Sequence, residues 1–258
     1  MSAPVTLIRL RPDVNALAKE AARAGFTPNG GDLGYALHAG LTALFGPELA
    51  PKPFALKDGA VLGYSPALPE EIQAAASLPL AGGTGLAAAL QPHTLETRAM
   101  PTLWRAGQAL DIEVRLRPVV RTRLGRGRER GGRERDLFFT AYPDPPDPAA
   151  PGAARKTLSK REAAYGDWLA AALRRDGAAV LHASRMTAYA RTKVLTRPET
   201  GQGRTHAAPE GPDATFLARI EIGAPEAFAK LLARGIGRHR AFGFGMLLLA
   251  PPGRLLKG

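Results

Sequence analysis

The residues whose types and spacing best suit chemistry lie near the end of the chain, where glycines surround basic side chains. The run is Gly235-Ile-Gly-Arg-His-Arg-Ala-Phe-Gly-Phe-Gly245. Glycine leaves backbone N–H groups unhindered, and Arg238, His239 and Arg240 add positive charge beside them. A loop of this kind can hold phosphate oxygens through backbone amides and guanidinium groups.

The neighbours of this glycine-rich loop narrow its role. Residues 224–234 are predicted as a helix, and the apolar run Met246–Leu249 after the loop is predicted as a strand. In the dinucleotide-binding fingerprint the order is the opposite, because a strand leads into the glycines and a helix follows them. A single glycine after a helix is often only a C-cap. Repeated glycines with three basic side chains between them exceed what a cap needs.

The five histidines are the candidates for acid–base chemistry: His38, His93, His182, His206 and His239. The chain has no cysteine, which excludes disulfides, thiolate chemistry, zinc ribbons and iron–sulfur clusters. No His-x-x-x-His or Asp-x-Asp cluster occurs, so a metal-dependent nuclease has little support and neither a metal nor another cofactor is expected. RNA can instead supply its own nucleophile, the 2′-hydroxyl, which a positioned acid or base drives onto the adjacent phosphorus.

His38 has the best-defined surroundings of the five. Asp32 is a good N-cap, and Leu33 to Phe45 place leucines at helical spacing before Gly46-Pro47 ends the helix. Tyr35 lies three residues before His38, so both side chains project from nearly the same face. On spacing alone, a partly exposed helix histidine without a role is the favoured explanation of His38.

The charge of the chain favours a polyanionic partner. Thirty-five Lys and Arg residues face 23 Asp and Glu, which gives a net charge of +12 in 258 residues. Nucleic acid is the first candidate, an anionic membrane surface is a weaker one, and a merely soluble basic protein is the alternative without a partner. No apolar run approaches the roughly 18 residues that a membrane helix needs. The first ten residues suggest a strand and not a signal peptide, so we expect a cytoplasmic protein.

Nine arginines fall between Arg115 and Arg135, where Glu129 and Glu134 are the only acids. Glycines lie among them, which indicates a flexible basic loop or hairpin tip and not an arginine-faced helix. Few aromatic residues occupy the predicted strand faces, which argues against stacking of bases on a sheet. We therefore expect the protein to bind a structured RNA stem through its shape and its phosphates.

The order of predicted elements indicates an α+β fold. In the second half the order is β-α-β-β-α-β, which is that of a ferredoxin-like fold, and Ser159 with Glu162 is predicted to form a capping box at the start of its first helix. The first half is compatible with the same order, although its fourth strand is not clear. The predicted elements are strands 6–10, 53–57, 60–64, 93–97, 109–117, 178–197, 214–222 and 246–249, and helices 13–24, 33–45, 66–77, 159–177 and 224–234.

Two motifs at opposite ends of the chain resemble a known family. The glycine-rich loop and Gly34-Tyr35-Ala36-Leu37-His38 are similar to segments of the CRISPR repeat endoribonuclease of the type I-E (Cascade, CasE-type) system, within the repeat-associated RNA-binding (RAMP) superfamily. The resemblance implies tandem ferredoxin-like (RRM-like) domains with antiparallel sheets. Residues 1–100 would form the domain with the Tyr/His helix, and residues 101–258 the domain with the Arg-rich segment and the glycine-rich loop.

The resemblance also implies roles and partners. His38 would be the general acid or base, and Tyr35 would orient the phosphate or the histidine. Without a metal, the protein would cut the repeat hairpin of a CRISPR transcript to a 2′,3′-cyclic phosphate and a 5′-hydroxyl. It would stay bound to the stem-loop of the crRNA and join the other Cascade subunits. The predicted RNA contacts are Arg121, Arg123, Arg185, Arg191, Lys193, Gly235, Gly237, Arg238, His239, Arg240, Gly243 and Gly245.

Two other interpretations remain. A non-catalytic RNA-binding subunit of the same superfamily would keep the glycine-rich loop and the arginines and leave His38 idle. A structural RNA-associated protein, such as a ribosomal one, would account for the charge but would leave the paired terminal motifs unexplained.

Overall fold

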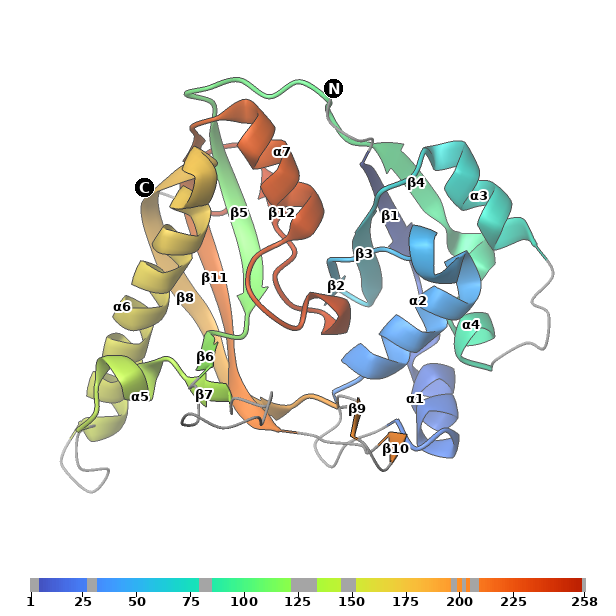
Figure 1. Ribbon diagram of the computed structural model, residues 1–258, viewed down its shortest axis with the longest axis horizontal. Helices are drawn as coiled ribbons and strands as arrows, with labels where there is room; N and C mark the ends of the chain where they lie inside the picture. The colour runs from blue at the N-terminus through green and yellow to red at the C-terminus, as the bar shows by residue number, and fades with distance from the viewer. Residues whose placement is uncertain are drawn as a thin grey trace.

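Two four-stranded antiparallel sheets, one from each half of the chain, organise the computed structural model (Figure 1). The structure describes residues 5–26, 32–78, 85–121, 134–144, 152–195, 199–200, 203–204 and 209–256. Each sheet packs helices against one face, and the two hydrophobic cores are separate clusters of buried side chains.

The first sheet has the strand order β2-β3-β1-β4, which is that of a ferredoxin-like fold. Strands β1 and β3 form its central pair, from Thr6 opposite Ser65 to Leu10 opposite Val61. Helix α2 supplies Leu41 and other apolar side chains to the core beneath it. The elements are β1 (Thr6–Leu10), α1 (Val14–Arg23), α2 (Gly34–Leu49), β2 (Phe54–Lys57), β3 (Ala60–Ser65), α3 (Pro69–Ser77), α4 (Gly85–Ala89), the 3₁₀ turn η1 (Pro92–Thr94) and β4 (Glu96–Ala99).

Local signals in the sequence explain most of these boundaries. The Asp13 carboxylate caps α1 by accepting the Ala16 amide at 2.9 Å. The β2–β3 hairpin turns at Asp58 and Gly59, whose φ values of 50° and 71° suit a type I′ turn. Gly46 has non-helical angles, with φ 76° and ψ 162°, so α2 bends there before its last turn. The fourth strand that the sequence left unclear is β4, which pairs with β1.

The second sheet has the equivalent order, β12-β5-β11-β8. Strict alternation along β5 and β11 puts Ile112, Val114, Phe216 and Ala218 in the core beneath α6 and α7, as predicted. The elements are β5 (Ala109–Leu116), β6 (Val119–Arg121), β7 (Glu134–Asp136), α5 (Phe138–Ala141), α6 (Ala153–Arg174), the 3₁₀ turn η2 (Arg175–Gly177), β8 (Ala179–Lys193), β9 (Glu199–Thr200), β10 (Gly203–Arg204), β11 (Glu210–Ile222), α7 (Pro225–Arg234), the 3₁₀ turn η3 (Arg240–Phe242) and β12 (Leu248–Ala250).

The predicted start of the long helix α6 was wrong. The helix begins at Ala153 and not at Ser159, which lies in its second turn. Glu162, the other half of the expected capping box, instead accepts the Met186 amide of β8 at 2.8 Å. Because this carboxylate bonds to a strand amide and not to the helix N-terminus, Glu162 here joins the helix to the sheet and does not form a capping box.

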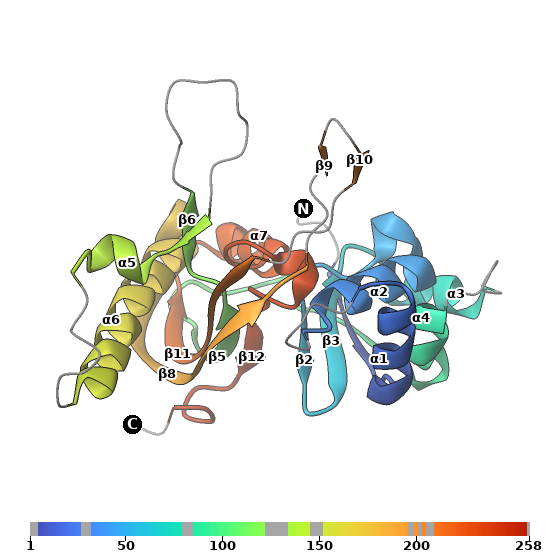
Figure 2. The same ribbon diagram turned by 90° about the horizontal axis from the view of Figure 1, so that it is seen from below.

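Two short strands, one within the arginine-rich segment 115–135 and one at its end, pair with each other at the base of a hairpin. Strands β6 and β7 pair antiparallel, with Arg121 opposite Glu134. Most of the segment, including Arg123, lies outside the described residues. The β6–β7 pair projects on the same side of the molecule as β9 and β10 (Figure 2). Buried Asp136 accepts hydrogen bonds from Arg161 and Tyr165 of α6 at 2.7 Å each, which anchors this base to the helix.

Contacts between the two sheets involve both hydrogen bonds and ion pairs. The Tyr64 hydroxyl donates to the Leu247 carbonyl at 2.8 Å, and Lys57 forms an ion pair with Glu113. The α+β, tandem ferredoxin-like architecture predicted for the chain is confirmed. We retain the division into domains 1–100 and 101–258 as a proposal.

Arg115 of β5 makes an ionic contact within its own sheet and another between the halves. Its guanidinium reaches Asp213 of β11 at 2.6 Å and Asp32, just before α2, at 3.1 Å. Both carboxylates are nearly buried, and hydrogen bonds and charge from them raise the pKa of Arg115 despite the opposing effect of its burial. Removing the guanidinium would leave two desolvated carboxylates without their cation.

Replacement of Arg115 by methionine is therefore expected to lower the free energy of unfolding by about 2–4 kcal/mol, measured by urea denaturation. The matched control is Arg9→Met. Arg9 also lies on a strand and pairs with Glu96, but both side chains are exposed, so a change of about 0.5 kcal/mol or less is expected. Equal losses in the two variants would contradict a special role for Arg115.

Candidate active site and nucleic-acid surface

The glycine-rich loop closes on itself between α7 and β12, as the predicted order of helix, loop and strand requires. The Ile236 amide donates to the Gly245 carbonyl at 2.8 Å, and the Gly245 amide donates to the Arg115 carbonyl at 2.7 Å. A Cβ on Gly245 would lie 2.0 Å from the Ile236 carbonyl oxygen, and one on Gly235 would lie 2.7 Å from the Gly245 carbonyl oxygen. These two glycines let the ends of the loop meet, and the residues between them form its tip.

Glu134 of β7 holds the tip of the loop. Its carboxylate accepts Arg238 Nε at 2.6 Å and lies 2.8 Å from His239 Nε2. Burial would raise the pKa of Glu134, but the hydrogen bonds and charges of His239 and Arg238 lower it to about 2. His239 has a left-handed backbone, with φ 59°, and a side chain only 8% exposed. The glycine-rich loop is thus tied to the base of the basic hairpin.

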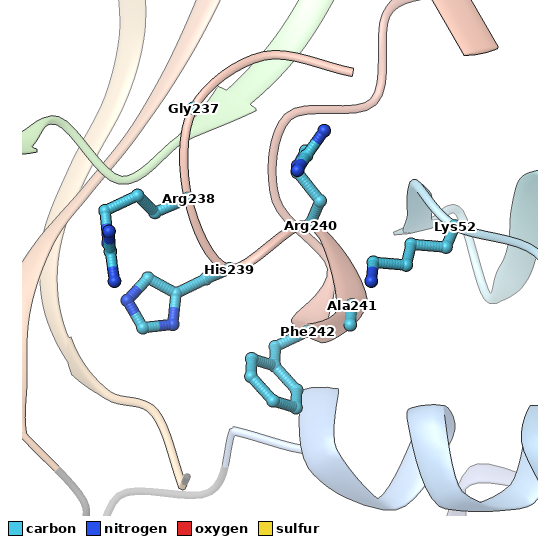
Figure 3. A pocket seen from close by; sticks show the side chains of 7 residues that line it. All are labelled: Lys52, Gly237, Arg238, His239, Arg240, Ala241 and Phe242. Carbon is cyan, nitrogen blue, oxygen red and sulfur yellow. The ribbon is translucent and has the colours of Figure 1, made fainter. Parts of the chain in front are cut away.

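An open pocket of about 480 Å³ lies under the loop tip (Figure 3). Lys52, from the segment between α2 and β2, extends toward Ala241 and Phe242 from the side opposite Arg238 and His239. No acidic side chain of the described residues lines the pocket, so none of the lining residues offsets the positive charge of its lysine and arginines. The lining consists of Lys52, Gly237, Arg238, His239, Arg240, Ala241 and Phe242.

Phe242 joins this pocket to the two residues singled out on α2. Its ring stacks on Tyr35 with a centroid distance of 5.8 Å, and the imidazole of His38 meets it edge-on at 5.6 Å. The rings of Tyr35 and His38 lie 6.4 Å apart. Segments about 200 positions apart in the sequence therefore share one aromatic cluster beside the cationic pocket.

Gly34 allows this close approach. A Cβ at this position would lie 2.4 Å from the Phe242 carbonyl oxygen, so the loop touches the backbone at the start of α2. Asp32 accepts the Gly34 amide at 2.8 Å and binds Arg115 with its other oxygen. The prediction of Asp32 as the N-cap was wrong by one residue, because the N-cap of α2 is Leu33, which makes no side-chain cap bond. Asp32 lies one residue earlier, where its carboxylate bonds to both the first helical amide and Arg115.

The surroundings of His38 favour a neutral imidazole. Burial lowers the pKa of His38 below its usual 6.5, and the nearby positive charge of Lys52 lowers it further. A neutral imidazole near neutral pH can accept a proton, and cations beside it can stabilise negative charge that develops on a phosphate. Lys52 was missed in the sequence because it stands alone between two prolines, with no spacing that links it to His38.

The other predicted RNA contacts divide into two groups. Arg191 and Lys193 of β8 are paired in register with Pro212 and Glu210, and Arg191 lines a cavity of about 190 Å³ with Glu134. Glu134, which lines that cavity, is also the residue that bonds to Arg238 and His239 of the glycine-rich loop.

Arg185 faces the other way. It is paired with Leu217, on the sheet face opposite the one that α6 covers. Cross-strand partners share a face, and the two register shifts in β8 determine which residues face the helix. Arg121 ends β6, at the base of the basic hairpin. By register, Arg185 and Arg191 therefore lie on opposite faces of the sheet.

Among the described residues, no group of three or more His, Cys, Asp or Glu side chains is arranged to hold a metal ion. None of the helices in the described ranges is long and apolar enough to cross a membrane.

Two ferredoxin-like units with a glycine-rich loop over a cationic pocket define the structural class of this protein. The profile of the family described as CRISPR associated protein matches residues 6–251. The chain belongs to this family, and the family resemblance of its two terminal motifs is confirmed. No curated protein sequence matches the chain.

Solved structures share the fold. One is a CRISPR endoribonuclease Cse3 bound to a 19-nucleotide RNA, with 17% identity and a TM-score of 0.57 over 96% of this chain and 100% of that one. Another is Thermus thermophilus Cse3 bound to an RNA that represents a pre-cleavage complex, with 17% identity and a TM-score of 0.54 over the same shares. At this identity the similarity establishes the fold.

Gly34→Ala tests the contact between α2 and the loop. Because the added Cβ would overlap the Phe242 carbonyl, we expect the free energy of unfolding to fall by about 1–3 kcal/mol, measured by urea denaturation. Gly166→Ala is the control, since its Cβ would meet only the Ser184 hydroxyl at 3.4 Å. An alanine there should stabilise α6 by up to about 1 kcal/mol. Similar behaviour of the two variants would argue against the close approach.

Proposed function

We propose that this protein is a metal-independent endoribonuclease that cleaves CRISPR precursor RNA within the repeat hairpin. The observation that carries the proposal is the placement of Tyr35 and His38 around Phe242, beside a pocket lined by Lys52 and Arg240. An acid–base group, a phenol and unneutralised cations are thus gathered where a phosphodiester can enter.

The proposed reaction uses the 2′-hydroxyl of the RNA as nucleophile. Neutral His38 accepts its proton as the O2′–P bond forms, and Lys52 with Arg240 stabilises the charge that accumulates on the phosphate oxygens. His38 then passes the proton to the 5′ oxygen as the P–O5′ bond breaks. The products are a 2′,3′-cyclic phosphate and a 5′-hydroxyl, and the histidine ends neutral. Tyr35 orients the imidazole or the phosphate.

The substrate class is supported by charge and by the related structures. The net charge of +12 and the arginines around the loop suit an RNA stem. The two Cse3 structures with this fold are bound to RNA, one of them as a pre-cleavage complex. We infer that the protein acts in the cytoplasm, keeps the product stem-loop bound and joins a Cascade effector complex.

His38→Ala is expected to slow cleavage of the cognate repeat RNA by about 10²–10⁴-fold, because it removes the proton acceptor. Affinity for the RNA should stay near wild type. The assay is single-turnover cleavage in excess EDTA, with the chemical ends of the products determined. His93→Ala is the control, because His93 is an exposed histidine that does not line the pocket.

A cut by the wild type that leaves a cyclic phosphate and is lost in His38→Ala would support the proposal. Tight binding without cleavage by either protein would favour the non-catalytic RNA-binding subunit. A requirement for a metal, shown by loss of cleavage in EDTA, would contradict the mechanism.

The pH dependence of cleavage should report His38. A general base must be neutral, so the single-turnover rate is expected to rise with pH and to level off through an inflection below 6.5. Lys52→Gln removes the charge that helps to lower the pKa of His38 but leaves its burial, so the inflection should move upward, toward 6.5.

The plateau rate of Lys52→Gln should also fall, by about 10- to 100-fold, if the ammonium stabilises the transition state. Lys57→Gln is the matched control, because this lysine pairs with Glu113 away from the pocket. A rate that decreases as pH rises through this range would assign His38 the role of acid. An inflection that Lys52→Gln leaves unchanged would show that the lysine does not act on the histidine.

A further inference from the structure

A second cavity, of about 320 Å³, opens on the other side of the glycine-rich loop. Helix α6, the end of α7 and the loop form it. Its lining includes four arginines and one tryptophan: Arg175, Arg234, Arg238, Arg240 and Trp168. None of its lining residues is acidic, so this cavity, like the pocket beside His38, is positively charged with no acid of its own.

The arginines of this cavity are crowded. Arg240 donates to the Arg234 carbonyl at 2.7 Å, which fixes its guanidinium beside another cationic side chain. Burial lowers the pKa of Arg240, and the charge of Arg234 lowers it further. An anion placed between these groups would relieve their repulsion. A phosphodiester suits guanidinium donors because it accepts two parallel hydrogen bonds.

Trp168 gives the cavity a second kind of contact. Tyr165, Leu169 and Leu173 of α6 are fully buried in the core, whereas Trp168 is only partly buried and lines the cavity. Its ring lies against Gly237, where a Cβ would come within 2.8 Å of it. A partly exposed indole among guanidinium groups suits an unstacked base, because single-stranded nucleic acid binds through aromatic stacking together with backbone charge.

The cavity adjoins the proposed catalytic pocket. Gly237, Arg238 and Arg240 line both. We propose that the Trp168 cavity is a subsite for the single-stranded nucleotide next to the scissile phosphate, whose base stacks on Trp168 and whose phosphate lies among the arginines. This subsite rests on the proposed function, since it assumes an RNA cut beside the loop. It adds recognition of a flanking single strand to recognition of the hairpin.

The test compares three cognate RNAs: the hairpin trimmed at its base, the hairpin with its 5′ flank, and the hairpin with its 3′ flank. A 2′-deoxy substitution at the cut prevents cleavage. The chain has two tryptophans, so in a Trp104→Phe background all tryptophan fluorescence comes from Trp168. One flanked RNA should quench this fluorescence, and the trimmed hairpin should not. Whether the RNA with the 5′ flank or the one with the 3′ flank quenches the fluorescence shows which flanking strand enters the cavity.

Affinity provides the second measurement. Trp168→Leu, which keeps an apolar side chain on α6, should weaken binding of the quenching RNA by about tenfold and leave the trimmed hairpin unaffected. Arg175→Gln should also weaken binding of that RNA selectively. Its neighbour Arg174→Gln is the matched control, because Arg174 is exposed and does not line the cavity.

Two results would overturn the subsite. The first is that neither flanked RNA quenches the fluorescence of Trp168. The second is that Trp168→Leu weakens binding of the trimmed hairpin and of the flanked RNAs equally. If the trimmed hairpin is still bound and the flanked RNAs with the 2′-hydroxyl restored are still cleaved, the subsite fails while the proposed function stands. If the wild type binds none of the three RNAs and cleaves neither flanked RNA with the 2′-hydroxyl restored, both fail together.

Discussion

The ionic contact of Arg115 with Asp213 and Asp32 is the constraint on which the site depends. Arg115 belongs to the middle of the second sheet, Asp213 to its neighbouring strand, and Asp32 to the turn that starts α2. The same guanidinium lies 4.3 Å from the centre of the Phe244 ring, and the Arg115 carbonyl accepts the Gly245 amide. One residue thereby holds the sheet, the glycine-rich loop and the helix with His38 in one arrangement, because buried carboxylates tolerate little displacement of their cation.

The positive charge around the loop has a physical consequence for binding. Arg238 is neutralised by Glu134, but Arg240 and Lys52 have no acidic partner among the residues that line their pockets. Such an arrangement repels itself and is held together by the packing and backbone hydrogen bonds around it. A polyanion relieves the repulsion, so binding and local stability are coupled: a ligand that prefers the folded state stabilises it.

Much of the fold was predictable because its signals are local. The alternation in β5 and β11, the Asp-Gly turn of the first hairpin and the helix before the glycine-rich loop all follow from residues that are near one another in sequence. The start of α6 was not predictable, since Glu162 bonds to a strand amide that the local pattern cannot reveal. The short strand β4 has little pattern of its own and is identified by its pairing with β1.

The sequence by itself determined the parts of the site: a Tyr-x-x-His helix, a loop of repeated glycines, a basic segment and the absence of cysteine. Only the tertiary structure decided how they combine. It placed Phe242 against both Tyr35 and His38, brought the isolated Lys52 near His38, and put Arg185 and Arg191 on opposite faces of the sheet. The reason is that these relations depend on sheet register and on contacts between distant segments, whereas residue spacing specifies only which side chains share a face within one element.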